Sequence, residues 1–199
     1  MKGLQMYKNV TIDLETLDTE TTAKILSIGV VPWNPGEQVS FQELCERESS
    51  LYIKIDQASF YAFPAFTESA GTIEFWDKQG EQARHVLEPD VNDVLIEKAL
   101  EQLKAHLKQW VEPLRRDQGL VFCRGYDFDG GILEHAFQQC GITPPWGYNR
   151  FRCVRTVIDT IANTRNGYVT GAEPEGFIKH HALHDAAMDT LTVLTLTQA

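Results

Sequence analysis

Val10-Thr11-Ile12-Asp13-Leu14-Glu15-Thr16, close to the N-terminus, alternates apolar and polar side chains without a break. This period of two predicts a β-strand over residues 8–16. On such a strand Asp13 and Glu15 point to one face, while Ile12 and Leu14 point to the other. Two carboxylates on one rigid face repel each other unless a cation lies between them. Pairs of this kind are also common on solvated strand edges, so this one alone does not establish a metal site.

The rest of the first half predicts two more strands and then helices. Apolar runs at residues 24–33 and 50–55 predict the strands, so the chain is expected to open as an antiparallel three-strand meander. Thr72 is a candidate cap for a helix that begins over residues 72–77, and helical spacing of apolar residues predicts another helix over 91–110.

The second half predicts a strand–helix unit and a closing helix. A short apolar run at residues 120–125 is typical of a buried strand, and the helix after it, over 131–140, ends at Gly141. The last helix, over 182–197, is expected to be amphipathic through Leu183, Ala187, Leu191 and Leu194. This order of elements predicts an α/β fold in which helices flank a mixed sheet.

Composition limits the class of protein. The chain has 199 residues, the length of one ordinary domain, and no run approaches the ~18 apolar residues of a membrane span. No apolar export signal follows Met1, so we expect a cytoplasmic protein without a membrane partner. The four cysteines form no Cys-x-x-Cys pair, which predicts reduced and mostly buried thiols.

The net charge of −10 argues against binding to duplex nucleic acid through a broad basic surface. It does not exclude nucleic acid as a substrate. Carboxylates that hold divalent cations count as negative in this sum, although the loaded site attracts phosphate.

A third acidic candidate follows the predicted strand at 120–125. Asp129 comes directly after Phe128 and just before the glycine-led helix, which is where α/β sheets bind ligands. An aspartate in this place also serves as a helix N-cap. Asp127 shares a face with Asp129 if the strand continues, and it remains a lesser candidate.

Two overlapping His-x4-Asp pairs lie near the C-terminus, His180 with Asp185 and His184 with Asp189. Their spacing is identical, so spacing does not choose between them. Asp185 and Asp189 are one helical turn apart, and Asp189 lies deeper in the last helix. His180 falls on a loop from which an imidazole can reach a substrate.

Three motifs therefore follow one another along the chain: Asp13-Leu14-Glu15-Thr16, Phe128-Asp129-x3-Leu133 and His180-x-Ala182-Leu183-x-Asp185-Ala186. Together they resemble the motifs of the DEDDh 3′–5′ exonucleases, the DnaQ-like branch of the ribonuclease H-like fold. The similarity spans residues 9–194, and its register implies that His180 and Asp185 are the catalytic pair.

Within that superfamily the chain resembles in particular the phage-type exonuclease A and exoribonuclease branch. The segments that carry this likeness are residues 72–76, Cys123-Arg124-Gly125, Arg155-Thr156 and residues 180–185. Gly125 departs from many relatives, which carry an asparagine four residues before the second-motif aspartate. A substrate contact by that asparagine is therefore not expected here.

The resemblance implies a ribonuclease H-like exonuclease domain over residues 1–199, with metal ligands Asp13, Glu15, Asp129 and Asp185. Asp13 would bridge two ions ~4 Å apart, Glu15 and Asp185 would bind the ion that activates water, and Asp129 would serve the second. Oxygen ligands favour Mg²⁺, with Mn²⁺ as a substitute. His180 would accept the proton of the water. The substrate would be single-stranded DNA or RNA, shortened from its 3′ end to 5′-mononucleotides.

Candidate substrate contacts are Thr16, Trp76, Arg124, Phe128 and Arg155. Trp76 is interpreted either as a stacking surface for a base or as a core tryptophan. The two arginines are candidates for phosphate contacts or for surface ion pairs. Rival hypotheses are a catalytically silent binding protein of the same fold and a nucleotide phosphatase. A second copy of the chain, forming a homodimer, is a further candidate partner.

Overall fold

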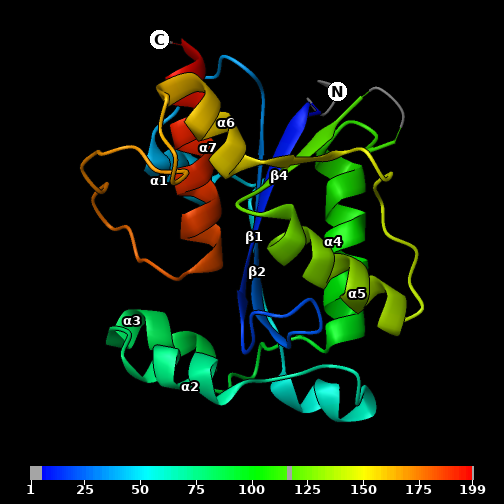
Figure 1. Ribbon diagram of the computed structural model, residues 1–199. Coiled ribbons are helices and arrows are strands. Elements are labelled where there is room, and N and C mark those ends of the chain that lie inside the picture. The colour runs from blue at the N-terminus through cyan, green and yellow to red at the C-terminus, as the bar shows by residue number, and fades with distance from the viewer. Residues whose placement is uncertain (1–5, 116–117, 199) are drawn as a thin grey trace.

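A five-stranded mixed sheet runs through the middle of the molecule, in the order β3-β2-β1-β4-β5 (Figure 1). This computed structural model describes residues 6–115 and 118–198. Strand β1 (Asn9–Thr16) pairs antiparallel with β2 (Ile25–Trp33), and β2 pairs antiparallel with β3 (Leu51–Lys54). On the other side, β4 (Leu120–Cys123) is parallel to β1, and β5 (Phe151–Cys153) is parallel to β4. The predicted meander and mixed sheet are confirmed.

The two faces of β1 carry different chemistry. Val10, Ile12 and Leu14 are buried in the main core against helices α4 (Ile96–Trp110) and α5 (Gly131–Gln139). Thr11 lies on the opposite face, where its hydroxyl contacts that of Thr190 in α7 (Ala182–Gln198) at 2.7 Å. Because side chains alternate along a strand, Asp13 and Glu15 share the face toward α7. The alternation of side chains along β1 therefore places its apolar residues in the core and its two carboxylates on the opposite face.

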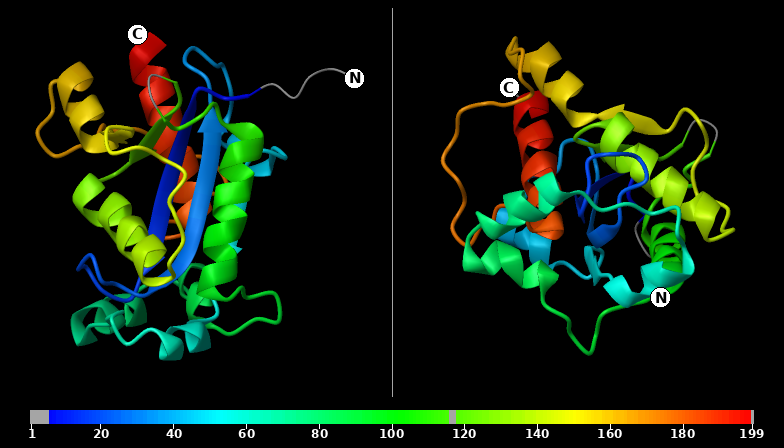
Figure 2. Two further views of the ribbon diagram at one scale, coloured as in Figure 1. Left: turned by 90° about the vertical axis from the view of Figure 1, so that its right-hand side faces the viewer. Right: turned by 60° about the horizontal axis from the view of Figure 1, so that its bottom comes forward.

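Shorter helices complete the molecule (Figure 2). Their bounds are α1 (Phe41–Glu46), η1 (Gln57–Ala62), α2 (Ala70–Asp77), α3 (Glu81–Arg84), η2 (His85–Leu87), η3 (Tyr126–Gly130) and α6 (Val154–Ala162). Helix α6 packs beside α7, whereas α2 and α3 lie at the lower end of the sheet in Figure 1. Among the described residues, no helix combines the length and the apolar content needed to cross a bilayer.

Two predicted helix starts are wrong. Helix α2 begins at Ala70, and its cap is Ser69, whose hydroxyl accepts the N–H of Thr72 at 3.1 Å. Helix α4 begins at Ile96 rather than at residue 91. The backbone of Val94 bonds to Lys54 and Asp56 beside β3, and these sheet-edge hydrogen bonds hold the segment extended despite its helical apolar spacing.

Helix α7 has the predicted bounds within a residue, and half of its predicted apolar stripe, Ala187 and Leu194, is buried. Leu183 and Leu191 are only partly buried, whereas Ala182, Ala186 and Thr190 are fully buried. These small residues let the helix approach the sheet closely. Gly29 of β2 has no side chain to prevent this, since a Cβ there would lie 2.2 Å from the carbonyl group of Ala182.

Candidate active site

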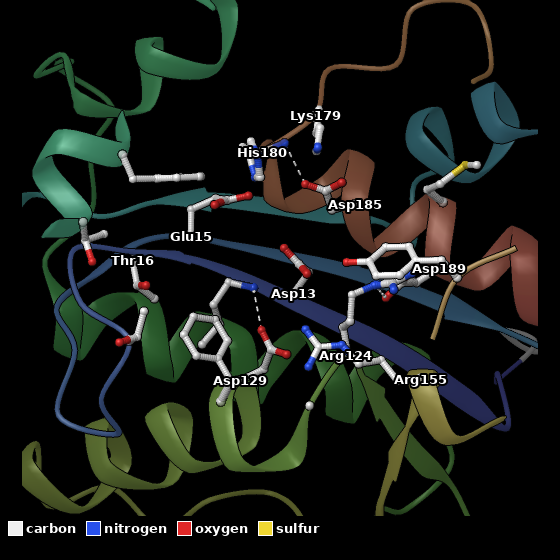
Figure 3. Close-up of a pocket in the computed structure, with 18 of the residues that line it drawn as sticks. Asp13, Glu15, Thr16, Arg124, Asp129, Arg155, Lys179, His180, Asp185 and Asp189 are labelled. Carbon is white, nitrogen blue, oxygen red and sulfur yellow. Dashed lines mark hydrogen bonds and ion pairs between the residues drawn. The ribbon is translucent and has the colours of Figure 1, made fainter. Parts of the chain in front are cut away.

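The side chains of Asp13 and Glu15 face a cavity of about 800 Å³ between β1, α2, α7 and the loop before α7. Asp13 lies opposite Gly29 in the β1–β2 pairing. The close approach of α7 at Gly29 therefore brings the first turn of that helix next to both carboxylates. Figure 3 shows the acidic residues converging from β1, η3 and α7.

Asp129 reaches the cavity from the π-helical turn η3. The β1–β4 pairing ends at Thr11 and Phe122, so the N–H of Leu14 has no partner in β4. Asp129 Oδ1 accepts this N–H at 3.2 Å, which ties the turn to β1 (Figure 3). Asp129 is 2% exposed, whereas Asp127 is exposed and lies outside the cavity lining. Of the two acids, the fold brings Asp129 to the site.

His180 and Asp185 close the cluster from the C-terminal side. The N–H of His180, a residue with a left-handed φ of 62°, donates to Asp185 Oδ2 at 2.8 Å. Ligand atoms of Glu15, His180 and Asp185 all lie within 4.8 Å of one another. The His180 ring meets Phe75 edge to face at a centroid distance of 5.0 Å. The imidazole is thus held between an aromatic ring and the carboxylates.

The overlapping pair takes other roles. The Nδ1 atom of His184 accepts the N–H of Ile178 at 3.0 Å, and its ring packs edge to face on Phe41, away from the cavity lining. Asp189 does line the cavity, but it is ion-paired with Arg124. The structure therefore gathers His180 and Asp185 with Glu15, and leaves His184 outside.

Crowding of buried acids at this site destabilises the folded protein when no cation is bound. Burial, and then the charges of Asp129 and Glu15, raise the pKa of Asp13 well above its ordinary value. Burial raises the pKa of Asp129 to about 7 and that of Asp185 to about 6. A divalent cation relieves such repulsion, and carboxylate oxygens are the ligands that Mg²⁺ and Mn²⁺ prefer. The donor set therefore fits a hard divalent metal.

The five expected substrate contacts all line the cavity, namely Thr16, Trp76, Arg124, Phe128 and Arg155, and Arg155 is exposed to solvent. Stacking by Trp76 is a wrong prediction. Its side chain is 1% exposed in a small core cluster, and its Nε1–H donates to the Thr16 carbonyl at 2.9 Å, so neither ring face is free for a base. The neighbouring Phe75 is 39% exposed and lines the cavity.

Arg124 is likewise not a free phosphate ligand. Its guanidinium binds Asp189 and the Gly167 carbonyl, so most of its donors are already used. Lys179 and Tyr168 also line the cavity, and neither was predicted as a site residue. Lys179 directly precedes His180, and this position in the sequence could have identified it as a cavity residue. Tyr168 lies in the loop between α6 and α7, where no local pattern marked it.

Gly125 lines the cavity beside Arg124. A Cβ built on it would lie 3.1 Å from an Asp127 oxygen and 3.6 Å from Nη1 of Arg155. A longer side chain at 125 would compete with both groups. The guanidinium of Arg155 therefore borders the space that a side chain at position 125 would fill.

Comparison with known proteins gives a consistent result. A family model described as the 3′–5′ exoribonuclease Rv2179c-like domain matches residues 8–197. An exodeoxyribonuclease of Enterobacteria phage T4 is 29% identical over 205 residues, which cover 90% of this chain and 85% of the phage protein.

Solved structures share the fold at low identity. The nuclease domain of 3′hExo, a DEDDh family member bound to rAMP, has a TM-score of 0.59 at 15% identity over 97% of this chain and 94% of its own. E. coli Exonuclease I in complex with a dA16 oligonucleotide has a TM-score of 0.61 at 12% identity, over 96% of this chain and 41% of its own.

Proposed function

The chain belongs to the family of 3′–5′ exoribonuclease Rv2179c-like domains and is a DEDDh-type 3′–5′ exonuclease, and we propose that it shortens single-stranded nucleic acid with two divalent ions and a histidine base. The observation that carries the proposal is the convergence of four acids and His180 on one cavity. The products would be 5′-mononucleotides.

Asp13, Glu15, Asp129 and Asp185 would hold the metal, with Mg²⁺ the expected ion and Mn²⁺ its substitute. Bound ions supply an acidified water and neutralise charge on the leaving oxygen. The protein keeps the carboxylates in place before metal arrives, through the Leu14–Asp129 and His180–Asp185 hydrogen bonds. Little reorganisation is then required when substrate binds.

His180 would accept the proton of the attacking water. Burial, and then the positive charge of Lys179, lower its pKa below the ordinary value. The imidazole is therefore neutral at pH 7 and able to take a proton. Its contact with Phe75 limits the ring's freedom and keeps it beside Glu15 and Asp185.

Charge along the cavity supports the 3′-to-5′ direction. Thr16 lies at one end in Figure 3, with the hydroxyl side chains of Thr19, Ser69 and Thr72 also in the lining. Arg155 lies at the other end (Figure 3). A 3′-terminal nucleoside has hydroxyls and no further phosphate, so it suits the hydroxyl end. The continuing strand, with a phosphate at each nucleotide, suits the cationic end.

The test is a time course with matched 5′-labelled single-stranded RNA and DNA, each with Mg²⁺, Mn²⁺ or EDTA. Both sugars are needed because the family is named for RNA and the phage relative for DNA. We expect a metal-dependent ladder that shortens from the 3′ end and is lost in Asp13→Ala. Asp127→Ala, at the exposed neighbouring acid, is the control and should keep the wild-type rate. Persistent hydrolysis by Asp13→Ala would exclude the metal assignment.

A further inference from the structure

Arg124 joins the acidic cluster to the loop between α6 and α7. It follows the last residue of β4, and its Nε–H donates to both carboxylate oxygens of Asp189, at 3.0 and 3.1 Å. Its Nη1 donates to the carbonyl of Gly167 at 2.9 Å, and the guanidinium carbon lies 4.5 Å from the centroid of the Tyr168 ring. One side chain thus contacts α7 and the loop together.

The loop is also fixed from α6. Asp159 Oδ1 accepts the hydroxyl of Thr164 at 2.6 Å and the N–H of Gly167 at 2.9 Å. Gly167 has a φ of 71°, and a Cβ there would lie 2.4 Å from Cγ of Arg155, so only glycine fits this turn. These contacts place Tyr168 beside the cavity, which it lines while remaining 56% exposed.

The tyrosine ring therefore has one face on Arg124 and other surface left for a ligand. Arg155, at the same end of the cavity, is an exposed cation that suits a backbone phosphate. An aromatic surface next to a cation is the combination that binds an unpaired base together with its phosphate. Phe75 lies by His180, in the part of the cavity that the terminal nucleoside would occupy.

We propose that Arg124 is a positioning residue that holds Tyr168 as the surface on which the base of the penultimate nucleotide stacks. This inference rests on the proposed function. It gives Arg124 a different role from the phosphate contact expected from sequence. The inference also assigns a role to the buried Asp189, whose carboxylate on α7 orients the guanidinium of Arg124.

The first experiment varies the base and the tyrosine together. Two single-stranded oligonucleotides are compared, one normal and one with an abasic residue in the penultimate position. For the wild type, loss of that base should lower kcat/KM about tenfold, as expected for one stacked base. In Tyr168→Ala the same loss should change kcat/KM less than about twofold, while Tyr168→Phe should behave as the wild type. Tyr148→Ala is the matched control, because Tyr148 is 94% exposed and outside the cavity lining.

The second experiment tests Arg124. Arg124→Met alone leaves Asp189 buried without its partner, so Asp189→Leu is combined with it. Arg124→Lys keeps the charge beside Asp189 but lacks the fork that also reaches Gly167. Thermal melting establishes that each variant is folded. In folded variants, the effect of the penultimate base should fall toward that of Tyr168→Ala.

The outcomes are distinct. Equal kcat/KM of the wild type for both oligonucleotides would overturn the inference and leave the exonuclease intact. A full tenfold effect retained in Tyr168→Ala would also overturn it. A full effect retained in folded Arg124 variants would overturn the positioning role. A wild type inactive on both substrates would overturn the proposed function itself.

Discussion

His180 combines a left-handed backbone conformation with a backbone hydrogen bond to Asp185. Non-glycine residues rarely adopt a positive φ, and such conformations persist where surrounding contacts hold them. Here the contacts are Asp185 on one side and Phe75 on the other. The residue is thus held beside Glu15 and Asp185, as the proposed role of proton acceptor requires.

Replacement of His180 tests this role directly. We expect His180→Ala to lower kcat by about 10²–10⁴-fold, the usual contribution of a general base. Metal binding, measured by titration calorimetry with Mn²⁺, should persist because the four carboxylates remain. His184→Ala should change kcat far less, since that side chain faces Phe41. A larger loss in His184→Ala than in His180→Ala would show that the other His-x4-Asp pair is catalytic.

At the scale of elements, helix α7 brings Asp185 to the site because the helix packs closely against strand β2. Gly29 and the small residues Ala182 and Ala186 form that contact. A helix displaced from β2 would carry Asp185 away from Glu15 and Asp13. Packing between two elements therefore determines the geometry of the carboxylates.

Gly29→Ala should be damaging for this reason. The added methyl would overlap the backbone of Ala182, so the helix must shift. We expect a loss of about 1–3 kcal/mol in the free energy of unfolding, as for overpacked cores, together with a fall in kcat. Urea unfolding and steady-state kinetics measure the two effects. Gly71→Ala is the control for stability, because its added Cβ would meet nothing within 4 Å beyond its chain neighbours and its own helix backbone. A Gly29→Ala protein with wild-type stability and rate would contradict the close packing.

The same elements show what sequence alone predicts. Strand β1 and its two carboxylates follow from local alternation, which depends on residues next to one another. The ion pair between Arg124 and Asp189, and the contact between Gly29 and Ala182, join segments far apart in the chain. No local pattern encodes these contacts. Sequence alone left two interpretations open for Trp76 and for Arg124, although it placed both near the site.

At the scale of the whole molecule, we expect the acidic cluster to make stability depend on pH and on the proposed metal. Asp13, Asp129 and Asp185 have raised pKa values in the folded protein, about 7 for Asp129 and about 6 for Asp185. The unfolded chain releases those protons near pH ~4. Between these limits the folded state binds more protons than the unfolded state. Linkage then requires that the cluster's contribution to stability falls as pH rises from about 4 to about 7.

A divalent cation should reverse that loss, because it binds the ionised cluster only in the folded state. We expect Mg²⁺ to raise Tm clearly at pH 8, where the carboxylates are charged, and little at pH 5, where protons compete with it. Asp13→Asn removes one of the repelling charges, so in EDTA at pH 8 it should raise Tm while weakening the response to Mg²⁺. Asp127→Asn is the control, because it changes the net charge by the same amount at an exposed residue outside the cavity. It separates repulsion within the cluster from the general repulsion in a chain of net charge −10. Equal Mg²⁺ shifts in the wild type and Asp13→Asn would mean that the ion binds elsewhere on the acidic surface.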